Sequence, residues 1–145
     1  MKRYLALIAL LVTYHAQADE VTLNNGDTLD WATTPLTSKD ILNANGGTIQ
    51  NLSGRVECRI NVGGEVTVYA AQGATPRLVC KVVKTGASGK LVFNGSVEVG
   101  GPNGSYPFID NGVIAFADSA TDAKVIFAAS SYTTSRLMPQ YWTLP

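Results

Sequence analysis

Histidine is almost missing from this chain. The only histidine among its 145 residues is His15, which lies in an N-terminal stretch that we expect to be removed from the mature protein. Without histidine, the mature chain cannot build a Ser-His-Asp or Cys-His nucleophile site or a histidine metal site. Cysteine is scarce as well, and its two residues, Cys58 and Cys80, could not bind zinc if they were joined to each other. We therefore expect no enzymatic activity and no cofactor.

Paired carboxylates are the catalytic arrangement that this composition leaves open. Asp27 and Asp30 lie close together in the sequence, as a glycosidase-like pair would require. They also lie beside an Asn-Gly turn, where aspartate is common for backbone reasons alone. We interpret both as turn residues.

Long hydrophobic runs are missing beyond the N-terminus. Lys2 and Arg3 precede a short apolar run over residues 4–12, and Ala16-Gln17-Ala18 has the small-x-small pattern of a cleavage site. This combination is typical of a secretory signal peptide, and the run is too short to span about 30 Å of hydrocarbon. We predict that residues 1–18 are cleaved on export, that the protein acts at the extracellular surface or in the periplasm, and that it has no membrane span.

Cleavage would leave 127 of the 145 residues, enough for a single domain over residues 19–145. The mature chain would keep nine of the eleven basic residues and all eleven acidic ones, so its net charge would be −2. A negative net charge argues against nucleic acid as a partner. The charges are segregated. Residues 19–40 carry five acids and one base, and residues 55–90 carry six bases and two acids. We expect self-association or contacts with other exported proteins.

Residues 55–70 have the clearest strand pattern. Apolar and polar residues alternate on both sides of Gly63-Gly64, as in half-buried strands. In a hairpin, the two apolar faces agree only if the connection has three residues and a bulge. We therefore predict a hairpin that places Ile60 opposite Val66.

The two cysteines gain a second meaning from the predicted export. An oxidising compartment favours a disulfide between Cys58 and Cys80. Closing the loop of 22 residues between them would stabilise the fold by about 3 kcal/mol in the chain-entropy model. A simple meander would hold the two cysteines too far apart, so Cys80 would have to lie on the other flank of the Cys58 strand or across a two-sheet core.

The fold class follows from short strands and missing helices. Outside the N-terminal run, no segment keeps a 3.6-residue apolar period long enough for a helix, whereas about eight short strands are separated by Gly and Asn turns. We predict an all-β, single-domain β-sandwich or barrel with one disulfide. A short β-solenoid also fits turn-rich strands without helices, but no strict repeat is visible, so we rank it second.

Two segments are candidates for binding. Residues 19–32 are predicted to form an extended arm or hairpin, in which Val21 and Leu23 alternate with polar residues and could complete the sheet of a neighbouring subunit. In the glycine-rich and proline-rich stretch 100–107, Asn103 and Tyr106 form a candidate ligand loop, since an aromatic ring beside polar groups suits a sugar. We interpret Trp31 as a core residue.

Three functions remain open from the sequence. The first is an exported structural or adhesive subunit of a surface assembly such as a pilus or fibre, with strand donation as its route of assembly. The second is a carbohydrate-binding, lectin-like module that uses the aromatic loop. The third is a periplasmic inhibitor. The first accounts best for the predicted export, the β-rich composition and the segregated charge.

Overall fold

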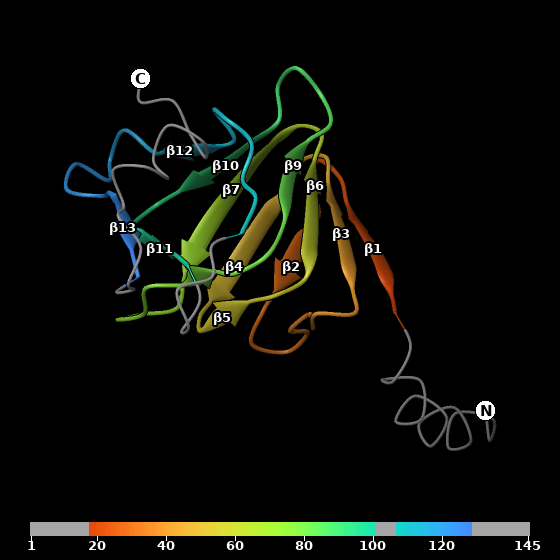
Figure 1. The fold of residues 1–145 in the computed structure, drawn as a ribbon. Helices are drawn as coiled ribbons and strands as arrows, with labels where there is room; N and C mark the ends of the chain where they lie inside the picture. The colour runs from red at the N-terminus through yellow and green to blue at the C-terminus, as the bar shows by residue number, and fades with distance from the viewer. Residues whose placement is uncertain (1–17, 101–106, 129–145) are drawn as a thin grey trace.

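The computed structural model describes residues 18–100 and 107–128, and this part of the chain contains strands and turns but no helix. The strands wind into a parallel β-solenoid of about four turns (Figure 1). In chain order they are β1 (Glu20–Leu23), β2 (Thr28–Asp30), β3 (Ile41–Ala44), β4 (Thr48–Leu52), β5 (Arg55–Val56), β6 (Arg59–Val62), β7 (Glu65–Ala70), β8 (Arg77–Leu78), β9 (Val82–Lys84), β10 (Lys90–Phe93), β11 (Val97–Val99), β12 (Ile114–Phe116) and β13 (Val125–Phe127).

Three sheets form the walls of the solenoid. Sheet A has the order β1-β3-β6-β9, sheet B the order β12-β10-β7-β4-β2, and sheet C the order β13-β11-β8-β5. All strand pairs are parallel. A complete turn contributes one strand to each sheet, as β6, β7 and β8 do, and the next turn stacks on it in register (Figure 1).

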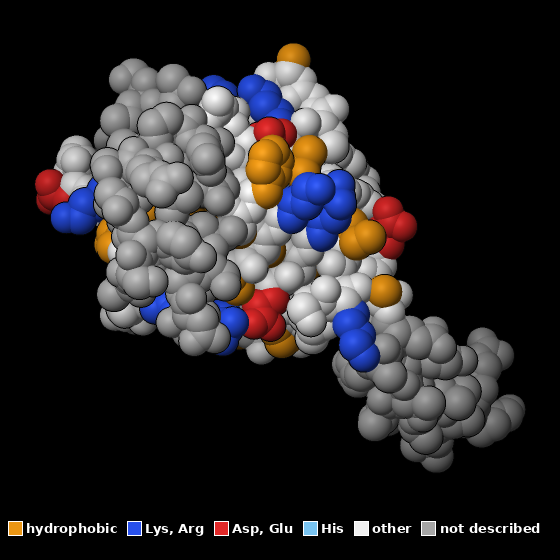
Figure 2. Space-filling view, viewed as in Figure 1, with side chains coloured by type: hydrophobic (Ala, Val, Ile, Leu, Met, Phe, Trp, Pro, Cys, Tyr) orange, Lys and Arg blue, Asp and Glu red, His pale blue; other side chains and the backbone are white. Residues whose placement is uncertain are grey.

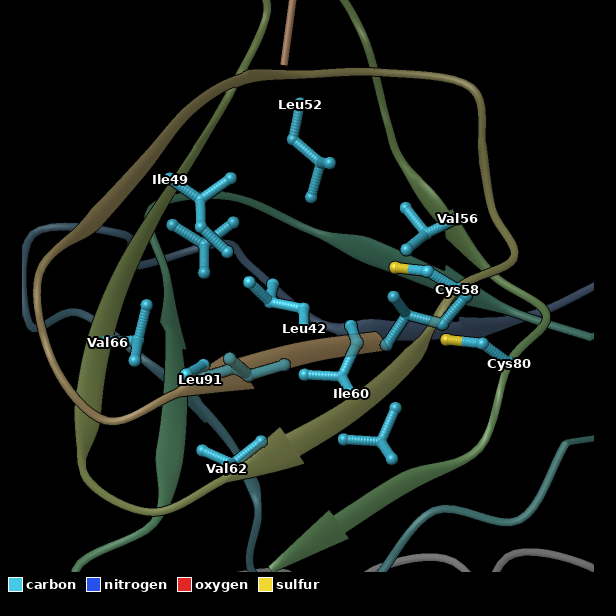
Figure 3. Packing of buried hydrophobic residues seen from close by; sticks show 14 of the residues in the cluster. Leu42, Ile49, Leu52, Val56, Cys58, Ile60, Val62, Val66, Cys80 and Leu91 are labelled. Carbon is cyan, nitrogen blue, oxygen red and sulfur yellow. The ribbon is translucent and has the colours of Figure 1, made fainter. Parts of the chain in front are cut away.

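The core lies inside the solenoid and consists of apolar ladders, in which residues from successive turns stack on one another. One ladder in each sheet shows the arrangement. They are Val21-Leu42-Ile60-Val82-Ile109 in sheet A, Leu29-Ile49-Val68-Phe93-Phe116 in sheet B, and Val56-Leu78-Val99-Phe127 in sheet C. Members from the inner turns are buried, and several of their side chains point toward one another in Figure 3. Burial of these stacked side chains is the main source of stability.

The all-β prediction is confirmed, but the sandwich or barrel is not what the chain forms. The predicted hairpin is also wrong, because β6 and β7 belong to different sheets. Gly63-Gly64 turns a corner between the two sheets, and after it Val66 points into the core as Ile60 does. The two apolar faces therefore agree without an antiparallel pair.

The glycine-rich corner between sheets A and B recurs along the chain. After the four sheet A strands come Asn24-Asn25-Gly26, Asn45-Gly46-Gly47, Gly63-Gly64 and Thr85-Gly86, and Asn111-Gly112 follows the isolated bridge at Ile109. Stacked residues of the sheet A ladder are 21, 18, 22 and 27 residues apart. This irregular spacing hides the repeat from a search for a fixed period, although the recurring corner residues are a signal that could have revealed it.

Gly47 illustrates why glycine occupies this corner. Its φ is +82°, and a Cβ atom built on it would lie 2.6 Å from the carbonyl oxygens of both Asn24 and Asp27 in the turn below. Neither the backbone conformation nor the available space suits another residue. The close approach of successive turns is what requires a glycine here.

Candidate functional site

The N-terminal end of the solenoid carries the predicted assembly residues. Val21 and Leu23 lie in β1, where they stack on Leu42 and Ala44 of β3 in the same chain. Leu23 is only 3% exposed, and Val21 is half-buried against the core. The predicted arm therefore forms the first turn of its own solenoid. Whether residues of β1 also contact another subunit remains a prediction.

The edges of two sheets are open at this end. β1 pairs with β3 and β2 pairs with β4, and within the described residues no strand pairs with the other side of either. The carbonyl oxygens of Asp19 and Leu23 accept hydrogen bonds from Ile41 and Asn45, so they face β3. Because backbone groups alternate in direction along a strand, the N–H of Thr22 faces away from β3, toward the open edge.

Asp40 ties the start of β1 to the loop before β3. Asp40 is buried, with 7% of its surface exposed. Oδ1 accepts a hydrogen bond from the backbone N–H of Asp19 at 3.0 Å, while Oδ2 accepts from the N–H and the hydroxyl of Thr37 at 2.7 and 3.1 Å. Asp40 is not among the site residues predicted from the sequence. The spacing Thr37-x-x-Asp40 is the signal that could have indicated a closed turn, which the bond from Asp40 N–H to the Thr37 carbonyl completes.

A polar ladder runs across the outer face of sheet A. Asn43 donates from Nδ2 to Oε2 of Glu20 at 2.7 Å, and Asn61 donates from Nδ2 to Oδ1 of Asn43 at 3.0 Å. Arg59 in turn donates from Nε to Oδ1 of Asn61 at 3.0 Å. The ladder joins three successive turns and ends at the carboxylate of Glu20 on the edge strand. Lys and Arg side chains gather beside hydrophobic ones on the face seen in Figure 2.

The predicted disulfide is wrong. Cys58 and Cys80 are free and buried, and their sulfur atoms point into the core from consecutive turns (Figure 3). Cys58 lies between β5 and β6, and Cys80 between β8 and β9, so the two occupy equivalent corners between sheets C and A. They act as small apolar side chains that fill this corner. The predicted export therefore gains no support from a disulfide.

The surroundings of the thiols oppose ionisation. Burial, followed by the negative charge of Asp40, raises the pKa of Cys58 from 9.0 to about 12. Burial, followed by the neighbouring Cys58, also raises the pKa of Cys80. Since the thiolate is the reactive form, these cysteines are not nucleophiles at neutral pH.

We expect the free energy of unfolding to fall as the pH rises from 9 toward 12. The unfolded chain loses its thiol protons near 9.0, whereas folded Cys58 keeps its proton until about 12. The unfolded state therefore binds fewer protons in this range, and stability that is fully present below pH 9 is lost as the pH rises. Urea midpoints measured between pH 8 and 11 test this.

The double variant Cys58→Ala/Cys80→Ala is the control, because it lacks the thiols and keeps every other titrating group. Its stability should depend less steeply on pH than that of the wild type. Parallel curves would contradict the assignment, as would fewer than two alkylatable thiols in the denatured, non-reduced protein.

Three other residues singled out from the sequence, Asp27, Asp30 and Trp31, lie in the described part of the chain. Asp27 accepts a hydrogen bond from the N–H of Asn24 at 2.9 Å, and Asp30 accepts from Ala32 N–H and Asn51 Nδ2 at 3.0 and 2.9 Å. These hydrogen bonds are typical of turn residues, and those from Asn51 and then Ala32 lower the pKa of Asp30. Trp31 is 6% exposed and belongs to the core, as predicted.

Asn103 and Tyr106 lie outside the described residues. An open hollow on the described surface is lined by residues 84–87 with Phe108, Asp110 and Asn111. Asp110 Oδ2 accepts a hydrogen bond from Lys84 N–H at 2.9 Å, and Lys81 Nζ lies 5.8 Å from the ring centre of Phe108. Among residues 18–100 and 107–128, no three His, Cys, Asp or Glu side chains are grouped so that they could hold a metal ion.

Comparisons with protein-family models, curated proteins and solved structures gave no match to this chain. Across the stretches that the structure describes, no helix is long and apolar enough to cross a membrane. The open sheet edges at β1 and β2 are the most distinctive feature of the described part of the chain.

Proposed function

We propose that this protein is an exported structural subunit that stacks end to end with copies of itself into a fibre at the cell surface. The observation that carries the proposal is the pair of open edges, β1 in sheet A and β2 in sheet B. An open edge offers a row of backbone donors and acceptors to a further strand. A second copy is a partner that always has strands of matching geometry.

The geometry of the ends favours a chain of subunits over a closed pair. In a parallel solenoid the first turn offers one edge of each sheet and the last turn offers the opposite edge. A contact between unlike surfaces is heterologous, and it propagates into a filament unless the rotation closes a ring. Continuing the sheets from one copy to the next would extend the same parallel ladders.

Side chains at the N-terminal end suit such a continuation. The polar ladder ends at Glu20, whose Oε2 accepts a bond from Asn43 within the chain. A carboxylate has capacity for further donors from an incoming strand. The basic residues Arg59 and Lys81 lie at the middle turns rather than at an end, so we base the proposal on backbone pairing and not on charge attraction between opposite ends.

We expect the purified mature protein to form linear polymers at high concentration and Thr22→Pro/Thr28→Pro to remain monomeric. The N–H of Thr22 faces the open edge, and so does that of Thr28, since the neighbouring Asp27 carbonyl accepts from Thr48 in β4. Proline removes those donors and places its ring at the edge without breaking the pairing to β3 or β4. Size-exclusion chromatography and negative-stain imaging measure the result.

Thr22→Val/Thr28→Val is the matched control, since it keeps both N–H groups and should still polymerise. Thermal melting of both double variants checks that each is folded. A wild-type protein that stays monomeric at every concentration would overturn the proposal. Polymers formed equally well by the proline variant would show that assembly uses another surface.

A further inference from the structure

The predicted cleavage point, between Ala18 and Asp19, lies directly beside the hydrogen bond that joins Asp19 N–H to Asp40 Oδ1. Ala18 and Asp19 are exposed and precede β1, so the peptide bond between them is accessible on the described surface. The backbone of Asp19 is held on both sides. Its N–H donates to Asp40 Oδ1 at 3.0 Å, and its carbonyl accepts from Ile41 N–H at 2.9 Å.

We propose that cleavage after Ala18 creates an α-ammonium group on Asp19 that forms an ion pair with the buried carboxylate of Asp40. This inference rests on the export that the proposed function includes. The step is a hydrolysis by an endopeptidase specific for small residues. Water adds its oxygen to the Ala18 carbonyl carbon, the C–N bond breaks, and the released amine of Asp19 takes up a proton at neutral pH. Ala18 leaves as a carboxylate.

Asp40 is already positioned to receive this charge. The N–H and the hydroxyl of Thr37 hold its Oδ2, and the bond between Asp40 N–H and the Thr37 carbonyl at 3.0 Å closes the turn. Oδ1 points at the nitrogen that would become the new N-terminus. Before cleavage this nitrogen is a neutral amide, and afterwards it carries a full positive charge beside a mostly buried carboxylate. Hydrogen bonds between ionised groups are shorter and stronger than those with a neutral donor.

The consequence would be a first turn that becomes firmly closed only after the leader is removed. Among the described residues, none before Val21 belongs to the core, so the packed interior begins after the new N-terminus. The ion pair would hold the first end of β1, which is an edge strand with a partner on one side. Processing would thereby stabilise the same edge that the proposed assembly uses.

A thermodynamic cycle tests the ion pair independently of export. Chains that begin at Asp19 or at Ala18 are released from a fusion protein in vitro, each with Asp40 or with Asp40→Asn, and their melting temperatures are compared. We expect the chain beginning at Asp19 to melt about 3 to 6 °C higher than the chain with one more residue. The difference should fall to less than about 1 °C with Asp40→Asn. An equal difference in both backgrounds, or none in either, would overturn the ion pair.

Three further measurements keep the proposal testable if the Asp40→Asn chain does not fold. Acetylating the α-amine of the chain that begins at Asp19 removes its charge while keeping Asp40, and should lower the melting temperature by a similar amount. Asp27→Asn removes another turn aspartate near this end and should leave the difference between the two starting points intact. N-terminal sequencing of exported protein should give Asp19 as the first residue, and any other residue would overturn the processing step. None of these measurements depends on whether the protein polymerises, so the ion pair and the proposed assembly can fail separately.

Discussion

Replacing Gly47 by alanine is expected to destabilise the protein by at least about 3 kcal/mol, from steric conflict together with strained backbone. A Cβ atom at this position would lie 2.6 Å from the Asn24 and Asp27 carbonyl oxygens and 3.2 Å from Leu23 Cγ. Two of these three atoms belong to the backbone of the neighbouring turn, which cannot move aside without lengthening its hydrogen bonds. The free energy of unfolding from urea denaturation measures the loss.

Gly54→Ala is the matched control for the backbone conformation. Gly54 also has a positive φ, +70°, but a Cβ atom there would meet nothing within 4 Å. Its substitution should therefore reveal the conformational strain alone, about 1 to 2 kcal/mol. Equal losses at Gly47 and Gly54 would mean that the close approach between turns contributes nothing.

Leu42→Ala is expected to destabilise the protein by about 3 to 5 kcal/mol, the upper part of the range for buried leucine. The side chain is fully buried, and it stacks between Val21 and Ile60 in the sheet A ladder. Backbone hydrogen bonds fix the spacing of the turns, so the walls cannot collapse into the cavity. Urea denaturation at constant m-value is the measurement.

Val21→Ala provides the comparison for Leu42. Val21 belongs to the same ladder but is half-buried at its first position. Truncation there should cost about 1 kcal/mol, since water can fill the space that the methyl groups leave. If the two variants lose the same free energy, the interior of the ladder is no more tightly packed than its end.

The strand pattern of residues 55–70 shows how far alternation can be used to predict this fold. It was predicted as two strands, and the structure has β5, β6 and β7 there, with a corner at Glu57-Cys58. Val56, Cys58 and Ile60 all point inward across that corner. Alternation reports which side of the chain is buried, and it continues through a bend between two sheets. It therefore could not distinguish three walls of a solenoid from the strands of a sandwich.

The partner of each strand was beyond the reach of local patterns. Ile60 stacks on Leu42 and Val82, which are 18 and 22 residues away, and no short-range feature specifies these distances. The disulfide was predicted from the expected compartment, whereas the core corner that the thiols fill is defined only by the fold. Asp40 was not predicted for a similar reason, since its role depends on Asp19, which directly precedes β1 and is distant in the sequence.

Because its turns stack on one another, the solenoid can change in length without any change in its cross-section. Each inner turn meets only the turn before it and the turn after it, so every contact in the ladders closes a short stretch of chain. Structures of this kind can grow outward from any folded turn, without waiting for remote segments to find each other. Duplicating one inner turn would lengthen the solenoid by about 4.8 Å and leave the walls unchanged. The irregular spacing from 18 to 27 residues in the sheet A ladder indicates that the loops outside the walls can vary in the same modular way.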